Sequence, residues 1–218
     1  MRYEVGTVLN IQNLNRPVHG QVITEDVYDG VTLYSLAQGT DLPVQTNPNY
    51  HCYFVLAGKL NVYLRDRMSV IASKIVSYGQ GIVVPYDEAV GCTALEGTVA
   101  TEVVLGKKLE TQKIRPMEVF TVKDLLAYQT GMAVHDTALN SGYSKLNIDA
   151  LDMNTVLQDL LAEGELIVTC LDGEGSVIYN GKESTLHFGE NYRIKSGTHY
   201  SLQTKDHPFK VSELIRIE

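Results

Sequence analysis

Short apolar runs, each bounded by glycine or other turn residues, recur along the whole chain. Each run has the length of a strand and is rich in Val, Ile and Tyr, which favour extended backbone. The clearest runs are Val31–Leu36, Tyr53–Leu56, Leu60–Leu64, Ile82–Val84, Val99–Leu105, Leu166–Leu171, Ser176–Tyr179, Tyr192–Ile194 and Val211–Ile217. This pattern predicts an all-β sandwich or barrel.

Helical patterns are short and few. The best is Thr121–Tyr128, where Thr121 has the residue type of a helix N-cap. Ile11–Leu14 is a shorter counterpart near the start of the chain. We therefore expect one short helix near the beginning of each half.

The two halves of the chain resemble each other. The segments that match are Val8–Leu14 with Val119–Leu125, Gly20 with Gly131, Tyr53–Gly58 with Val168–Gly173, and Gly79 with Gly189. The first half is longer between its two glycines, and the extra residues fall in an expected hairpin around Arg65–Ser69. The matches predict a tandem duplication. The alternative is one continuous β-sandwich whose strands align with one another by chance.

The segment Gly106–Lys113 is charged and poor in apolar residues, so it is expected to connect the two halves. We place the boundary at residue 112, which gives domains of residues 1–112 and 113–218.

The composition excludes some classes of function. The formal net charge is -8 and the pI is near 5.2, so long-range electrostatics repel nucleic acid and anionic membranes. Cys52, Cys92 and Cys170 lie far apart, which argues against a disulfide framework and a structural zinc site. The first residues lack a secretory signal pattern, and we expect a cytoplasmic protein.

Three segments of the second half carry a resemblance to a known family: Gly173–Lys182, Leu186–Glu190 and Lys195–Leu202. They resemble the repeat of the cupin family, whose motifs read G-x5-H-x-H-x(3,4)-E-x6-G and G-x5-P-x-G-x2-H-x3-N. The resemblance extends over nearly the whole chain, once per half. It implies two tandem cupin barrels, that is, a bicupin of two jelly-roll or double-stranded β-helix barrels.

In that family two His, a Glu and a third His bind a divalent metal inside the barrel. In the first half the corresponding positions carry Gln45, Asn47, His51 and Val90, and Asp87 stands at the internal glycine of the second motif. Neutral amides are weak ligands for transition metals, and valine is none. We therefore expect no metal cofactor, with Gln45, Asn47 and His51 as the candidate ligands if a divalent ion does bind.

In the second half the corresponding positions depart further from the family's pattern. They carry Leu160, Ala162 and Leu166 with the shorter spacing of the motif, or Asp159 and Leu161 at the two histidines with the longer one. Tyr200 replaces the last histidine. We expect an interior that is apolar except for one phenol, with Val168 on the same strand face as Leu166.

Alternation along the strands turns His51, Tyr53 and Cys92 into the first barrel, where they are candidate catalytic residues. A histidine near a cysteine can generate a thiolate, and a histidine with a tyrosine can transfer protons. The alternative is that all three are core residues. The remaining histidines, including His135, are expected on the surface.

Three functions follow. The first is a metal-free double cupin that binds a small neutral or apolar ligand, in a pocket of Gln45, Asn47, His51, Val90, Leu160, Leu166, Val168 and Tyr200. The second is an enzyme, either a metal-dependent dioxygenase or isomerase or a metal-free isomerase, that uses the first barrel around His51. The third is a structural or interaction module in which the barrels pair within the chain or the chain forms a homodimer. We favour a protein without catalysis.

Overall fold

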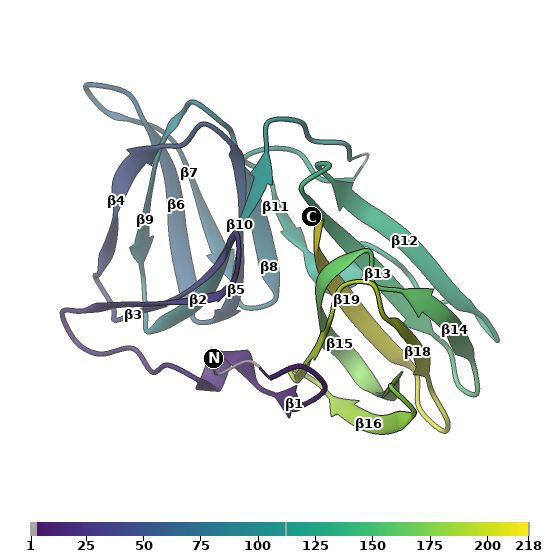
Figure 1. Cartoon of the computed structure of the whole chain (residues 1–218). Helices are drawn as coiled ribbons and strands as arrows, with labels where there is room; N and C mark the ends of the chain where they lie inside the picture. Colours follow the sequence, from purple (N-terminus) through teal and green to yellow (C-terminus); the bar gives the residue numbers. More distant parts are fainter. Residues whose placement is uncertain (1–3, 112, 218) are drawn as a thin grey trace. The chain divides into compact units, whose positions relative to one another are not determined.

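The structure is a computed structural model that describes residues 4–111 and 113–217 (Figure 1). Nearly all of its regular structure is β-strand, and the residues form two compact units. The unit formed by Gln12–Thr121 is called the N-terminal barrel below. The unit formed by the residues up to Ile11 and by those from Val122 onward is called the C-terminal barrel. The boundary expected at Gln112 falls on a residue outside the described ranges.

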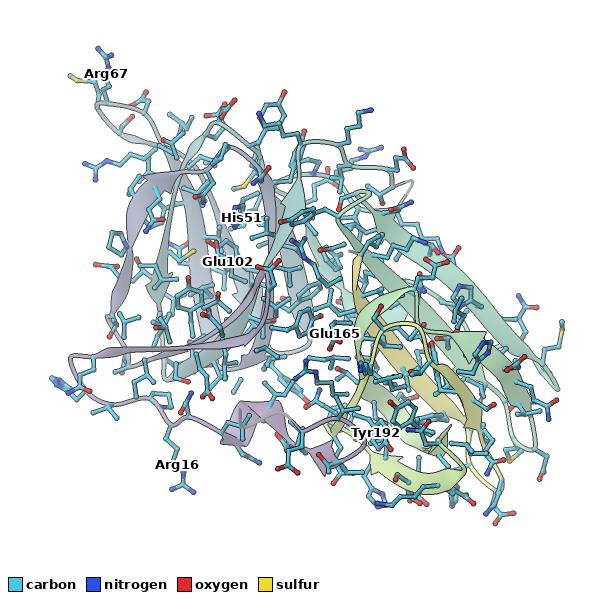
Figure 2. The ribbon with its side chains drawn as sticks, in the orientation of Figure 1. Arg16, His51, Arg67, Glu102, Glu165 and Tyr192 are labelled. Atoms are coloured by element: carbon cyan, nitrogen blue, oxygen red, sulfur yellow. The ribbon has the colours of Figure 1, made fainter. Side chains whose placement is uncertain are left out.

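The N-terminal barrel consists of two antiparallel sheets (Figure 1). The strand order of the first is β11 (Val119–Thr121), β8 (Gln80–Val84), β5 (Tyr50–Ala57), β10 (Thr98–Gly106), β3 (Val31–Leu36) and β2 (Val22–Tyr28). The order of the second is β4 (Asp41–Thr46), β9 (Ala89–Ala94), β6 (Lys59–Arg65) and β7 (Val70–Ser77). The expected hairpin joins β6 to β7, and Arg67 lies at its tip (Figure 2).

The C-terminal barrel has strands in the corresponding order. Its first sheet is β1 (Val8–Leu9), β17 (Asn191–Ile194), β15 (Gly164–Tyr179), β19 (Phe209–Ile217), β13 (Ser144–Leu151) and β12 (Ala133–Asn140). Its other pairings join β14 (Val156–Leu161) to β18 (His199–Gln203), and β18 and β16 (Lys182–His187) to the second part of β15. The long strand β15 therefore corresponds to β5 and β6 together.

In each larger sheet, one of the two edge strands comes from the other half of the sequence. In the N-terminal barrel, β11 pairs with β8, and in the C-terminal barrel, β1 pairs with β17. A hydrogen bond of 2.9 Å from the Ile11 amide to Asn191 Oδ1 holds the segment that follows β1. The C-terminal barrel is therefore built from two separate stretches of chain, whereas the N-terminal barrel is one continuous stretch.

The predicted strands are confirmed, because every one of the nine apolar runs lies within a β-strand. The predicted helices are wrong. Their positions carry only three-residue 3-10 turns, η1 (Ile11–Asn13) and η2 (Val122–Asp124). A segment of about eight residues gains too few hydrogen bonds to offset the cost of helix nucleation. Within the described residues, no helix is long and apolar enough to cross a membrane.

Many of the recurring glycines stand where the backbone is left-handed, with positive φ. Gly58 has φ +76°, and a Cβ there would lie 2.2 Å from the Gly97 carbonyl oxygen. Gly173 has φ +70°, and its Cβ would lie 1.9 Å from the Pro208 oxygen. Asp87, at the position of a family glycine, keeps the same conformation with φ 57°, which aspartate tolerates better than most residues.

Alternation along the strands fills each barrel with apolar side chains. In the N-terminal barrel the core includes Tyr53, Val55, Leu60, Val62, Ile82, Val90 and Cys92. In the C-terminal barrel it includes Leu166, Val168, Tyr192, Tyr200, Phe209 and Val211. Each core also contains polar groups, which define the sites described next.

Candidate functional site

Glu102, labelled in Figure 2, accepts hydrogen bonds from three side chains in a partly buried polar cluster of the N-terminal barrel. It belongs to β10, which runs between β3 and β5, and it pairs across the sheet with Thr32 and Tyr53. Its side chain is 15% exposed, and that of its neighbour His51 is 11% exposed. A carboxylate at this depth needs hydrogen-bond donors to remain ionised.

Three side chains supply those donors. His51 Nδ1 lies 2.8 Å from Glu102 Oε1, and the Tyr53 hydroxyl donates to the same oxygen over 2.7 Å. The Tyr34 hydroxyl donates to Oε2, also over 2.7 Å. Burial raises the pKa of Glu102, but the hydrogen bonds from His51, Tyr53 and Tyr34 outweigh burial and hold it below its ordinary value. An ionised carboxylate only accepts, so Nδ1 of His51 carries a proton.

The two phenols stay neutral. Burial raises the pKa of Tyr34 and of Tyr53 well above the ordinary value, and the negative charge of Glu102 raises both further. Each phenol therefore keeps its proton and donates a hydrogen bond to the carboxylate. The cluster is a carboxylate held by neutral donors and by the imidazole.

A cavity of about 360 Å³ opens beside this cluster. Five of the predicted site residues line it: Gln45, Asn47, Tyr53, Val90 and Cys92. The remaining lining residues are Val22, Tyr34, Leu42, Pro43, Gly91 and Glu102. His51 is not part of the lining and reaches the site through its bond to Glu102.

Gln45 and Asn47, two of the three expected metal ligands, line this cavity. The third, His51, is placed to hydrogen-bond to Glu102. Nδ1 of His51 is engaged by Glu102, and the Gln45 side chain is exposed. Val90 offers no ligand atom at the position of the family's last histidine. The imidazole therefore helps to hold the carboxylate.

The thiol of Cys92 is poorly suited to nucleophilic attack. Cys92 is 1% exposed, and burial, together with the charge of Glu102, raises its pKa well above the ordinary value. Because the thiolate is the reactive form, this environment favours the interpretation that Cys92 is a core residue. A catalytic role of His51, Tyr53 or Cys92 stays a prediction.

In the C-terminal barrel the expected pocket residues form part of one packed cluster. Leu166 and Val168 are fully buried, Tyr200 is 4% exposed, and Leu160 packs against them. A separate hollow of about 210 Å³ has other linings, among them Glu174, Glu183 and His207. The four predicted residues therefore lie together as core.

The expectation that this second interior is apolar except for one phenol is wrong. The Tyr200 hydroxyl donates to Glu213 Oε1, and Asn147 Nδ2 donates to Oε2 over 3.4 Å. Asp149 is fully buried beside them, and its Oδ1 lies 2.6 Å from Nδ1 of His135. His135, expected simply on the surface, has a 43% exposed side chain that contacts a buried carboxylate.

Glu102 and Glu213 are the residues that sequence reasoning missed. Each is the single acidic residue within its strand, β10 or β19, flanked on both sides by mostly apolar residues. A charged residue inside a strand that is buried along its length is unusual unless it has partners. That signal could have identified both positions.

The comparisons with known proteins rest on structure. No protein-family model matches the chain, and no curated protein matches it. Its fold is similar to that of a cupin 2 conserved barrel domain protein from Leptotrichia buccalis, with a TM-score of 0.87 and 18% identity, over 99% of this chain and 98% of that one.

Two enzymes are more distant structural neighbours. Salicylate 1,2-dioxygenase from Pseudaminobacter salicylatoxidans gives a TM-score of 0.64 with 12% identity, over 84% of this chain and 69% of its own. A variant of oxalate decarboxylase from Bacillus subtilis gives 0.56 with 9% identity, over 98% and 78%. These likenesses establish the fold, and the chain has the cupin fold that its sequence resemblance predicts.

Proposed function

We propose that the N-terminal barrel binds a small uncharged molecule that presents a hydrogen-bond donor to Glu102. The observation that carries this proposal is the ionised, largely buried carboxylate of Glu102 at the wall of a cavity of about 360 Å³. That volume lies within the range of small-molecule sites, about 300–1,000 Å³. The remaining walls are apolar groups and the neutral amides of Gln45 and Asn47.

The hydrogen-bond inventory of Glu102 supports a donor on the ligand. A carboxylate has about four acceptor sites, and His51, Tyr53 and Tyr34 use three of them. About one acceptor site is left for a ligand. A carboxylate-bearing ligand would bring a second negative charge to a poorly solvated site, which is unfavourable.

A ligand panel tests the proposal. Neutral amides and alcohols are compared with carboxylates of the same size by the shift in thermal unfolding temperature and by calorimetry. We expect the neutral donors to bind, and Glu102→Gln to abolish their binding. The matched control is Glu96→Gln, because Glu96 is a half-exposed carboxylate of the same barrel. Equal binding of the carboxylates, or unchanged binding by Glu102→Gln, would contradict the proposal.

A metal-free isomerase is the second candidate. It is favoured by the hydrogen-bonded series His51–Glu102–Tyr53, in which Tyr53 reaches the cavity. Such groups can move a proton to and from a bound carbon acid. The test is deuterium incorporation into a bound ligand in D₂O, followed by NMR. We expect deuterium exchange into the ligand, and we expect Tyr53→Phe to slow it. A ligand that binds without any exchange would contradict the isomerase and support a binding function only.

We also propose that the two barrels arose by tandem duplication of one cupin unit, which makes the chain a bicupin. The corresponding strand orders support this, as do glycines with positive φ at matching places in the two halves. These pairs are Gly20 with Gly131, Gly58 with Gly173, and Gly79 with Gly189. Relatives that each contain a single barrel similar to both halves would test the duplication.

A further inference from the structure

Three strands of the C-terminal barrel place ionisable side chains together. His135 lies on β12, Asp149 on β13 and Glu213 on β19, and these strands are neighbours in one sheet. Asp149 pairs across the sheet with His135, and Glu213 pairs with Asn147, two residues before Asp149. The three side chains therefore converge on one region of the barrel wall.

The distances suit a shared ion. One candidate ligand atom from each of His135, Asp149 and Glu213 can be chosen so that all three lie within 4.8 Å of one another. The shortest separation, 2.6 Å, joins His135 Nδ1 to Asp149 Oδ1. Ligand atoms about 2.0–2.2 Å from a common metal lie at most about 4.4 Å apart, so a bound ion would need only a small inward shift of these groups.

One of the two buried carboxylates has an oxygen without a hydrogen-bond partner. Asp149 is fully buried, and its Oδ2 has no hydrogen-bond partner. Within residues 4–111 and 113–217, it is the only carboxylate oxygen in that condition. A buried charged oxygen without a partner is costly, which is the observation that points to an absent ligand.

The second carboxylate adds to that cost. Glu213 is 2% exposed, and an oxygen of its carboxyl group lies within 4.8 Å of a carboxylate oxygen of Asp149. A divalent cation would offset the repulsion between the two carboxylates.

We propose that His135, Asp149 and Glu213 bind one divalent first-row metal ion in the C-terminal barrel. One imidazole nitrogen and two carboxylate oxygens suit Mn²⁺, Fe²⁺ or Zn²⁺, and three protein ligands leave positions open for water or a small molecule. The exposed side of the His135 ring provides a route for the ion from solvent.

Other side chains hold the ligands in place. The Tyr200 hydroxyl and the Asn147 amide both donate to Glu213. Such outer partners orient a ligating carboxylate. The three ligands stand at other positions than those that the family's motifs assign to metal, which carry Leu160, Ala162, Leu166 and Tyr200 in this barrel, and only Tyr200 of these contacts the site. It is also independent of the function proposed for the N-terminal barrel.

Calorimetric titration of the untagged, chelator-treated full chain tests the site. We expect one Mn²⁺ or Zn²⁺ to bind per chain, with a matching loss of the free Mn²⁺ signal in electron paramagnetic resonance. His135→Ala and Glu213→Gln should each weaken binding by at least about 10–100-fold, the effect usual for removing even an outer partner. His135→Ala changes a partly exposed ring, and circular dichroism verifies that each variant is folded.

Two matched controls distinguish this site from general metal binding. His199 lies 2.7 Å from Asp159 in the same barrel, but both side chains are exposed, so His199→Ala should leave the affinity unchanged. Glu96→Gln, on a half-exposed carboxylate of the other barrel, should also leave it unchanged. The proposal is overturned if the wild-type chain binds neither ion, or if His135→Ala and Glu213→Gln bind as tightly as the wild type.

Discussion

Glu102 and Glu213 occupy corresponding positions in the two barrels but have opposite surroundings. Each lies in the middle of a nine-residue strand, β10 or β19, and each accepts a hydrogen bond from a phenol. The pKa of Glu102 is held below its ordinary value, whereas burial and Asp149 raise that of Glu213 to about 8. The same place in one fold therefore holds a charged acceptor in one barrel and a carboxyl that favours its proton in the other.

The strand register explains why the two glutamates have different surroundings. Glu102 pairs with Thr32, and the residue two positions further along β3 is Tyr34, a donor. Glu213 pairs with Asn147, and the residue two positions further along β13 is Asp149, a second carboxylate. A donor in one barrel and an acceptor in the other thus stand at matching places. This difference favours a small-molecule site in the first case and a cation site in the second.

The largest expected effect comes from removing the Glu102 carboxylate. Glu102→Ala leaves His51, Tyr53 and Tyr34 without their shared acceptor, and we expect a loss of about 3 kcal/mol in the free energy of unfolding of the N-terminal barrel. Urea unfolding measures it, with Glu96→Ala as the exposed control. A loss no greater than that of the control would mean that the cluster does not stabilise the barrel.

Removing one donor should cost less. Tyr34→Phe keeps the ring and deletes the hydroxyl that donates to Glu102 Oε2, so we expect a loss of about 1.5 kcal/mol, as for hydrogen bonds to charged groups. The pKa of Glu102 should rise toward its ordinary value. Tyr86→Phe, on an exposed ring of the same barrel, is the control for urea unfolding. Equal stabilities of the two variants would contradict the role of Tyr34.

The acid limb of the stability curve should report on Glu102. Its folded pKa lies below its ordinary value of 4.5, so the folded state binds fewer protons than the unfolded state at acid pH. The resulting stability is present above about pH 4.5 and is lost as the pH falls through the folded pKa. Urea unfolding between pH 6 and pH 3 should show this loss, and Glu102→Gln should lack that component. An acid limb that is the same in both proteins would argue against an ionised Glu102.

The smallest effect is expected at Glu213 in the metal-free chain. Because its pKa is about 8, the carboxyl is mostly protonated at pH 7, and glutamine is a neutral residue of similar shape. Glu213→Gln should therefore change the free energy of unfolding by less than about 0.5 kcal/mol, whereas Glu102→Gln should lower it clearly. A large loss for Glu213→Gln would remove the contrast between the barrels.

The sequence predicted the strands and the fold more completely than the sites. Apolar runs and glycines that need left-handed backbone determine the barrels, and both are local signals. The family's motif positions led to the cavity in the N-terminal barrel, because Gln45, Asn47 and Val90 line it. Glu102 and Glu213 belong to no motif, and their partners lie on strands distant in sequence. Only the register of those strands brings the partners together, so a local pattern could mark each glutamate as unusual but could not reveal its partners.

The most direct test of the contrast is the titration of both carboxyl groups in one sample. Carbon-13 NMR of the glutamate side chains in the chelator-treated full chain, with Glu102→Gln and Glu213→Gln to assign the signals, gives both pKa values. We predict a pKa below 4.5 for Glu102 and near 8 for Glu213. Two similar values, or a higher value for Glu102 than for Glu213, would contradict the account.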